Sequence, residues 1–220
     1  NTTVLKFWAA HKGRPKLVTI GTSCVYEEGR ELVEDQYLEG TPIDSLYTYA
    51  MTKRMLLIGQ RSLAKQFGLK HLTVVPSTLY GPGYHLEGKQ LHFIFDLAAK
   101  MLRFRDGGAP VVLWGDGHQR RELINVHDFV DDMLYLTDRV DDEVVNIGGG
   151  TDHSIREFAG TLAGIIGIDE AKIDYDTTKY VGAKSKSLDI SKLRRLRPDL
   201  KRTALADGLS EMVRYMDGKL

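Results

Sequence analysis

A long helix between two short apolar strands, near the start of the chain, constrains the fold more than any other feature of this sequence. Residues 16–20 and 71–75 read as buried strands, and residues 47–67 read as a helix that Gly68 is expected to end. Two strands joined through a helix in this way form a right-handed crossover in a parallel sheet. The sequence therefore predicts an α/β fold built around a parallel sheet.

The rest of the chain predicts a mixture of helices and strands, with a change of texture after Pro82. Helices are expected near residues 1–12, 89–104, 127–138, 154–166 and 203–216, and extended segments at 111–114, 121–126, 144–147 and 172–175, whereas 22–46 reads mostly as loop. We expect one domain over residues 1–83 and a smaller mixed α/β domain over residues 84–220, interleaved with the first.

Composition excludes several classes of partner. The 220 residues carry 30 basic and 30 acidic side chains, so the formal charge is zero and no general attraction to nucleic acid or membrane is expected. The single cysteine rules out an internal disulfide and fits a reducing cytoplasm. No apolar run reaches membrane-spanning length. We expect a cytoplasmic protein with no metal site.

Tyr49 and Lys53 are candidate catalytic residues. At this spacing they share one face of the predicted helix, about 6 Å apart along its axis. A nearby ammonium stabilises a tyrosinate, which lets tyrosine act as a general acid or base. The pattern alone is weak, because it recurs at 175/179, 180/184 and 215/219. Those pairs lack the flanking strands, so we interpret only Tyr49 and Lys53 as functional.

Thr22 and Ser23 place two hydroxyls after the first predicted strand. Ligands of open α/β sheets bind beyond the carboxyl ends of the strands, so either hydroxyl could meet a substrate there. The alternative is a turn hydroxyl that satisfies a local backbone group. Cys24 follows directly, and a lone cysteine is more often inert packing.

Several strings carry a resemblance that spans nearly the whole chain. They are residues 21–26 (GTSCVY), 49–53 (YAMTK), 76–82 (PSTLYGP), 112–122 (VLWGDGHQRRE), 146–150 (NIGGG), 154–157 (SIRE) and 186–189 (KSLD). In this order they resemble the extended short-chain dehydrogenase/reductases of the NAD-dependent epimerase/dehydratase family, in particular the GDP-L-fucose synthase branch. The resemblance implies part of a doubly wound Rossmann-type sheet, with residues 1–83 as the C-terminal part of the dinucleotide-binding domain and 84–220 as the substrate domain.

Enzymes of the GDP-L-fucose synthase branch epimerise a nucleotide-activated 4-keto sugar and then reduce it with NADPH. The resemblance implies that Thr22 and Tyr49 bind the C4 oxygen, that Tyr49 protonates it, and that Lys53 holds the nicotinamide ribose. The family's hydroxyl stands four residues before a loop tyrosine, here Tyr26, which indicates Thr22, with Ser23 as second choice. Cys24 would be the base of the epimerisation.

The resemblance also implies binding residues. For NADP, with NAD as an alternative, they are Gly21, Thr22, Tyr49, Lys53, Pro76 and Leu79. For a nucleotide-sugar substrate, expected to be GDP-linked, they are Ser23, Thr78, Trp114, Arg121 and Lys186. Without the resemblance, Arg121 and Lys186 would more often be surface charges. A homodimer is expected. The helices near 56–63 and 91–102 are a candidate dimer face, but burial within the chain would explain their apolar residues equally well.

Two positions depart from the family pattern. Ungapped matching puts Glu87 where the family has a histidine acid, and His85 stands two residues earlier. The epimerisation acid is therefore His85, Glu87 or absent. Thr78 replaces an asparagine of the family's string, which leaves the identity of the sugar open.

No Gly-x-x-Gly-x-x-Gly turn follows a strand in these 220 residues, so the pyrophosphate cradle of a dinucleotide site is not among them. We therefore expect a truncated chain or one half of a split protein, with an unpaired apolar sheet edge. Two other functions stay open. One is a nucleotide-sugar 4-epimerase or dehydratase, and the other is a non-catalytic remnant that binds a nucleotide sugar or a partner protein.

Overall fold

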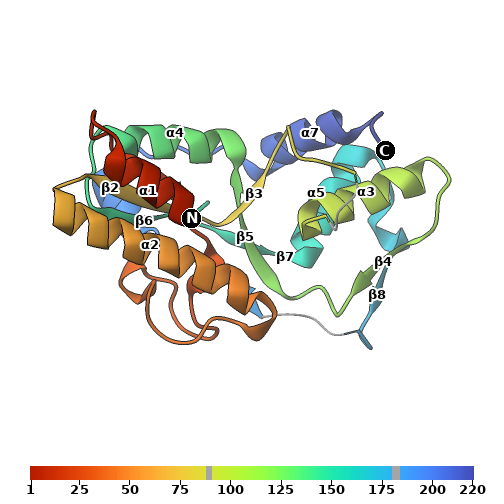
Figure 1. Cartoon of the computed structure of the whole chain (residues 1–220). Coiled ribbons are helices and arrows are strands. Elements are labelled where there is room, and N and C mark those ends of the chain that lie inside the picture. The colour runs from red at the N-terminus through yellow and green to blue at the C-terminus, as the bar shows by residue number, and fades with distance from the viewer. Residues whose placement is uncertain (88–90, 180–183) are drawn as a thin grey trace. The chain divides into compact units, whose positions relative to one another are not determined.

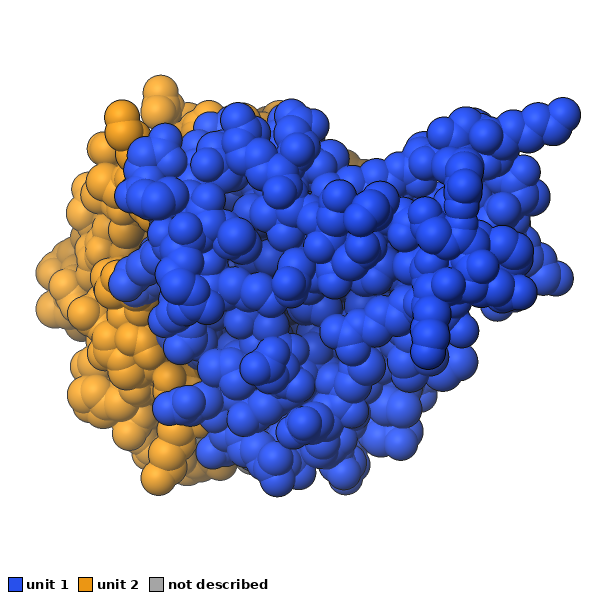
Figure 2. Space-filling model, turned by 90° about the vertical axis from the view of Figure 1, so that its left-hand side faces the viewer, with its two compact units in different colours: residues 1–77, 129–150, 187–200 blue, residues 78–128, 151–186, 201–220 orange. Residues whose placement is uncertain are grey.

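The chain divides into two units, each assembled from three separate segments (Figure 2). Unit 1 comprises residues 1–77, 129–150 and 187–200, and unit 2 comprises residues 78–128, 151–186 and 201–220. The computed structural model describes residues 1–87, 91–179 and 184–220. The first change of unit falls between Ser77 and Thr78. The assignment of 1–83 to cofactor and 84–220 to substrate stays a prediction.

A three-stranded parallel sheet is the centre of unit 1 (Figure 1). Its order is β1 (Leu17–Ile20), β2 (His71–Pro76), β6 (Glu143–Ile147), with Leu17 opposite His71 and Leu72 opposite Glu143. The helices are α1 (Thr2–Ala10), α2 (Tyr47–Phe67), α6 (Ser191–Leu196) and the greater part of α4 (Val126–Thr137). The crossover from β1 through α2 to β2 confirms the predicted α/β fold and its parallel sheet.

One face of α2 is buried, and this face fixes the helix against the sheet. Ala50, Arg54, Leu57 and Gln60 are buried at helical spacing, and Gln60 Oε1 accepts the hydroxyl of Thr19 on β1 at 2.9 Å. The helix ends at Gly68 with left-handed backbone, as predicted. Helix α1 approaches α2 at Gly59, where a Cβ would lie 2.3 Å from a methyl carbon of Leu5.

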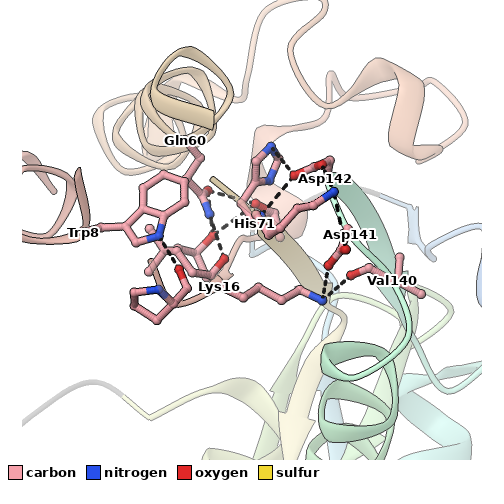
Figure 3. Close-up of polar contacts among 12 residues, drawn as sticks. Trp8, Lys16, Gln60, His71, Val140, Asp141 and Asp142 are labelled. Atoms are coloured by element: carbon pink, nitrogen blue, oxygen red, sulfur yellow. Dashed lines mark hydrogen bonds and ion pairs between the residues drawn. The ribbon is translucent and has the colours of Figure 1, made fainter. Parts of the chain in front are cut away.

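The amino-terminal end of β1 is tied to the end of α4 by one lysine (Figure 3). Lys16 Nζ donates to the carbonyl oxygens of Thr137 and Val140 and lies 2.9 Å from Asp141 Oδ1. An ammonium at this place satisfies the carbonyls that a helix leaves free at its carboxyl end. Trp8 of α1 is buried beside it and donates to the carbonyl of Pro15 at 2.7 Å.

In its described residues, unit 2 has three helices packed on short strands. The helices are α3 (Phe93–Arg105), α5 (Ile155–Ile166) and α7 (Leu205–Met216). One sheet runs β3 (Thr78–Tyr80), β5 (Arg120–Asn125), β7 (Asp152–Ser154), with β9 (Ser185–Lys186) also on β5, and a second pairs β4 (Val111–Trp114) with β8 (Ile173–Asp176). Phe95, Phe158 and Met212, one from each helix, are buried in the common core.

Several elements differ from the prediction. Helix α3 begins at Phe93 rather than at Lys89, which itself lies outside the described residues. The predicted loop 22–46 contains three 3₁₀ turns, at Ser23–Val25, Glu34–Gln36 and Asp44–Leu46. The strands β3, β7 and β9 were not predicted, because two or three residues show no periodicity, and neither was helix α6, which has only six residues. Of the two interpretations of residues 91–102, burial within the chain is the one that fits, since Leu97 and Leu102 are buried in the core of unit 2.

None of the helices in the described part of the chain combines the length and the apolar character that crossing a bilayer requires. Across residues 1–87, 91–179 and 184–220, no group of three or more His, Cys, Asp or Glu side chains is placed to hold a metal ion.

Candidate active site

Tyr49 and Lys53 lie at the carboxyl end of β1, as their place in the first turns of α2 predicts. Lys53 Nζ donates to the carbonyl oxygen of Ile20, the last residue of β1, at 2.8 Å. The same nitrogen is 5.8 Å from the centroid of the Tyr49 ring. The Tyr49 side chain is half exposed. An open phenol and an ammonium therefore stand together at the strand end where α/β folds bind ligands.

The other tyrosine–lysine matches in the described residues have other surroundings. Lys219 Nζ lies 3.7 Å from the centroid of the Tyr215 ring, at the end of α7. The Tyr175 ring is covered instead by the guanidinium of Arg156, at 3.9 Å. Neither pair stands at a strand end of the sheet in unit 1.

The hydroxyl of Thr22 caps the short turn after β1. Thr22 is buried, and its Oγ1 accepts the N–H of Cys24 at 3.3 Å. This bond uses the oxygen as acceptor, so the hydroxyl is still able to donate to a ligand. Ser23 and Cys24 are half-buried in the turn itself. Both sequence readings of Thr22, a turn cap and a ligand-facing hydroxyl, are compatible with this geometry.

Gly21 is required where β1 meets the turn. Its N–H donates to the carbonyl of Val74 at 2.7 Å, and a Cβ would lie 2.8 Å from the hydroxyl oxygen of Tyr37 and 3.1 Å from Val75 Cγ2. Pro76, another predicted cofactor residue, ends β2 and is half-buried. The predicted residues of unit 1 therefore gather on the carboxyl ends of β1 and β2 and the start of α2.

This part of unit 1 fits one section of a dinucleotide. Lys53 offers ammonium hydrogens to ribose hydroxyls, and Tyr49 and Thr22 offer hydroxyls to a reacting oxygen. The half-exposed ring of Tyr49 leaves the approach open. The described residues therefore suit the nicotinamide riboside part of the cofactor. The glycine-rich turn that would bind the pyrophosphate of the dinucleotide is not in the sequence.

Two predicted substrate residues of unit 2 face each other across neighbouring strands. Arg121 on β5 is the register partner of Lys186 on β9. On its other side, Arg121 is the register partner of His153 on β7. Register partners project from the same face of a sheet, about 5 Å apart, and like charges in that position repel. Basic side chains in such a row are suited to binding a diphosphate.

His153 was missed by the sequence analysis, because only strand register puts it next to Arg121. Its Nδ1 lies 3.9 Å from Glu157 Oε1 on α5, and its ring contacts Phe158 edge to face at 5.5 Å. Glu157 also accepts the N–H of Ser154 at 2.6 Å, which ties β7 to the start of α5.

The remaining predicted residues of unit 2 lie on loops and short strands. His85 is exposed and stacks on Tyr84 at 4.4 Å, and Tyr84 stacks in turn on the buried Phe95 at 3.9 Å. Glu87 is exposed in the same loop, so His85 and Glu87 both stay candidates for the acid. The other three predicted residues lie on strands, Thr78 and Leu79 half-buried on β3 and Trp114 exposed at the end of β4.

An asparagine links the segment after β1 to β6, and the sequence analysis did not single it out for this role. Asn146 Oδ1 accepts the hydroxyl of Tyr26 at 2.6 Å, and its Nδ2 donates to the carbonyls of Leu32 and Asp189. Its own N–H donates to Glu34 Oε1 at 2.9 Å. Burial raises the pKa of Glu34 and that of Tyr26. Sequence patterns do not show these hydrogen bonds, because each partner lies more than 40 residues from Asn146 along the chain.

Residues 1–148 match the model of the "NAD dependent epimerase/dehydratase family". The chain is 33% identical over 210 residues to GDP-L-fucose synthase 1 of Arabidopsis thaliana, covering 92% of this chain and 64% of that protein. It is 29% identical to the GDP-L-fucose synthase of Escherichia coli (strain K12), covering 86% of this chain and 63% of that protein. The chain thus spans less than two thirds of these curated relatives.

Solved structures share the fold. A GDP-L-fucose synthetase from Naegleria fowleri bound to NADP superposes with a TM-score of 0.84 at 24% identity, over 91% of this chain and 63% of that one. A UDP-glucose 4-epimerase from Thermotoga maritima, with UDP-glucose, gives 0.83 at 23% identity, over 99% of this chain and 68% of that one. At these identities the likeness supports the Rossmann-type fold.

Proposed function

This chain belongs to the NAD dependent epimerase/dehydratase family, and on that premise we propose that it carries the proton-transfer and substrate-binding parts of an NADP-dependent enzyme. The enzyme epimerises and reduces a GDP-linked 4-keto-6-deoxy sugar. One observation carries the proposal: Lys53 bonds to the last carbonyl of β1 beside the open phenol of Tyr49. NADP is the proposed cofactor, because a GDP-L-fucose synthetase of this fold is bound to it.

In the reduction, Tyr49 donates its phenolic proton to the C4 oxygen of the sugar, and the hydroxyl of Thr22 donates a hydrogen bond to the same oxygen. Lys53 binds the nicotinamide ribose and stabilises the tyrosinate that is left. NADPH supplies the hydride when it is bound. The ammonium is held for this by the carbonyl of Ile20, which fixes the lysine next to the tyrosine.

In the epimerisation, Cys24 removes a proton from a carbon next to the ketone, where the carbonyl makes that proton acidic. The acid that returns a proton is His85 or Glu87. The stack of His85 on Tyr84 supports the histidine, because it limits where the imidazole can lie.

Arg121 and Lys186 bind the diphosphate of the substrate, and their register on β5 and β9 supports this role. Ser23 and Thr78 contact the sugar, and Trp114 offers an exposed ring on which a base can stack. The identity to GDP-L-fucose synthases favours guanine. A second candidate is a dTDP-linked sugar, since the chain is also 32% identical over 167 residues to a dTDP-4-dehydro-6-deoxy-D-allose reductase from a Streptomyces species, covering 76% of this chain and 49% of that protein.

Calorimetric titration of the 220-residue chain with GDP, dTDP and UDP tests the nucleotide class. We expect saturable binding that is tightest for GDP and at least about tenfold weaker in Arg121→Gln, because a charge-assisted bond to the diphosphate is lost. Arg103→Gln, an exposed arginine of α3, is the matched control and is expected to bind as the unsubstituted chain does. Preference for dTDP would establish the second candidate, and no binding of any nucleotide would contradict the proposal.

We further propose that the protein is a cytoplasmic homodimer. Helices α1 and α2 carry exposed apolar side chains, among them Val4, Phe7, Met55 and Ile58. A second copy of the same pair of helices would remove this apolar surface from water.

A further inference from the structure

Arg54 is a buried cation that the proposed reaction does not use. It follows Lys53 on α2, but its side chain points into the protein and is 5% exposed. Burial lowers the pKa of its guanidinium, and Nε has no hydrogen-bond partner among the described residues. A guanidinium is costly to remove from water, so its remaining bonds must compensate for this cost.

Those bonds all go to the backbone of the segment that follows β1. Nη1 donates to the carbonyl of Gly40 at 2.8 Å, and Nη2 donates to the carbonyls of Val25 and Glu39. Val25 stands at the start of this segment and Glu39–Gly40 at its end. One side chain therefore fastens both ends of the loop to the helix that carries Tyr49.

Tyr37, which lies within the loop, is the second part of the arrangement. It is 1% exposed, and its hydroxyl lies against Gly21, where a Cβ would be 2.8 Å away. Its ring meets Tyr26 edge to face at 6.0 Å. Burial raises the pKa of Tyr37. The loop is thus anchored directly beneath the turn that bears the candidate hydroxyl and thiol.

We propose that Arg54 is a positioning residue, which holds the Thr22–Cys24 turn in register with Tyr49 by binding the backbone of the loop behind it. This inference rests on the proposed function for its meaning. Arg54 itself transfers no proton. It acts on the turn through its bond to the carbonyl of Val25, the residue that follows Cys24. A purely structural arginine would instead stabilise the whole of unit 1 with no special effect on the turn.

The single cysteine of the chain makes the turn directly observable. Cys24 is half-buried, so the rate at which a small alkylating reagent modifies it under native conditions reports how well this turn shields the thiol. We expect Arg54→Met to raise that rate by at least about tenfold, since the bonds of a charged donor to three carbonyls are lost. Arg54→Lys keeps the charge but cannot span the same carbonyls, and should give an intermediate rate.

Lys16→Met is the matched control. Lys16 is also a partly buried cation of unit 1 that donates to backbone carbonyls, but at the opposite end of β1. It should lower the melting temperature as Arg54→Met does, while changing the Cys24 rate by less than about twofold.

Equal acceleration in Lys16→Met and Arg54→Met would show that the turn opens only with the whole unit, and would overturn the proposal. An unchanged rate in Arg54→Met would overturn it as well. If circular dichroism shows that Arg54→Met does not fold, the comparison of Arg54→Lys with Lys16→Met decides in the same way. The assay uses no nucleotide, so its outcome is independent of whether the proposed function holds.

Discussion

His71, the first residue of β2, is a buried histidine whose protonation opposes folding (Figure 3). Burial lowers the pKa of its imidazole, although Asp142 acts in the opposite direction with Oδ1 4.0 Å from Nε2. The ordinary value is about 6.5, so the unfolded chain takes up the proton first as the pH falls. The histidine therefore contributes stability above that pH, and the contribution is lost as the pH falls below it.

We predict that the melting temperature falls as the pH is lowered from about 7.5 to about 5.5, and that His71→Asn reduces this dependence. His118→Asn, which replaces an exposed histidine of unit 2, serves as control and should leave the slope as it is. Scanning calorimetry over this range measures the slopes. A dependence of equal size in His71→Asn would refute the role given to this side chain.

At the same scale, residue types and their places beside predicted strands predicted part of the candidate site. Thr22, Tyr49 and Lys53 were predicted because hydroxyl, phenol and ammonium occur at recognisable places beside a strand and on a helix. Arg54 and Tyr37 were not, because their roles depend on carbonyls and a glycine that only folding brings near. Nothing in the spacing of an arginine shows that it will be buried.

At the scale of elements, helix α5 begins with a capping box. Ser154 Oγ accepts the N–H of Glu157 at 3.1 Å, and Glu157 Oε2 accepts the N–H of Ser154 at 2.6 Å. Because α5 packs in the core of unit 2 and adjoins β7, weakening its start also loosens the strand that holds His153.

We predict that Ser154→Ala lowers the free energy of unfolding by about 1 kcal/mol, since one N–H of the first turn loses its acceptor. Ser210→Ala is the control, because this hydroxyl donates to the carbonyl of Ala206 in the middle of α7, where alanine favours the helix. Urea denaturation compares the two. A loss from Ser210→Ala as large as that from Ser154→Ala would contradict the capping account.

Elements with a strong apolar or helical pattern were predicted well, and the shortest ones were not. The long helix α2 and the buried strands β1 and β2 have strong patterns and clear ends. Strands β7 and β9 have three and two residues, and they form only because β5 offers both of its edges. The row formed by Arg121, Lys186 and His153 therefore depends on pairing between distant segments, which no local pattern records.

At the scale of the whole molecule, the exposed apolar side chains of α1 and α2 lead to a prediction on assembly. Phe7 is 69% exposed and Met55 59%, and both stand on helices that lie side by side in unit 1 (Figure 1). If two copies pair through these helices, Phe7→Glu should shift sedimentation equilibrium from dimer to monomer, because a buried unpaired carboxylate opposes association. Val130→Glu changes an exposed apolar residue of α4 and should leave the dimer intact. A monomer in the unsubstituted chain would contradict the homodimer.

The central claim is that Tyr49 donates the proton when NADPH reduces a GDP-linked 4-keto sugar. It is tested most directly by fusing residues 1–220 to the part of the Arabidopsis thaliana relative that this chain does not span, and following the loss of NADPH absorbance with GDP-4-keto-6-deoxymannose. We predict turnover that falls about 10²- to 10⁴-fold in Tyr49→Phe with NADPH binding retained. Tyr215→Phe, the same substitution in the matching pair on α7, should keep full activity. A fusion that binds NADPH without turnover, or a Tyr49→Phe variant as active as the unsubstituted one, would contradict the account.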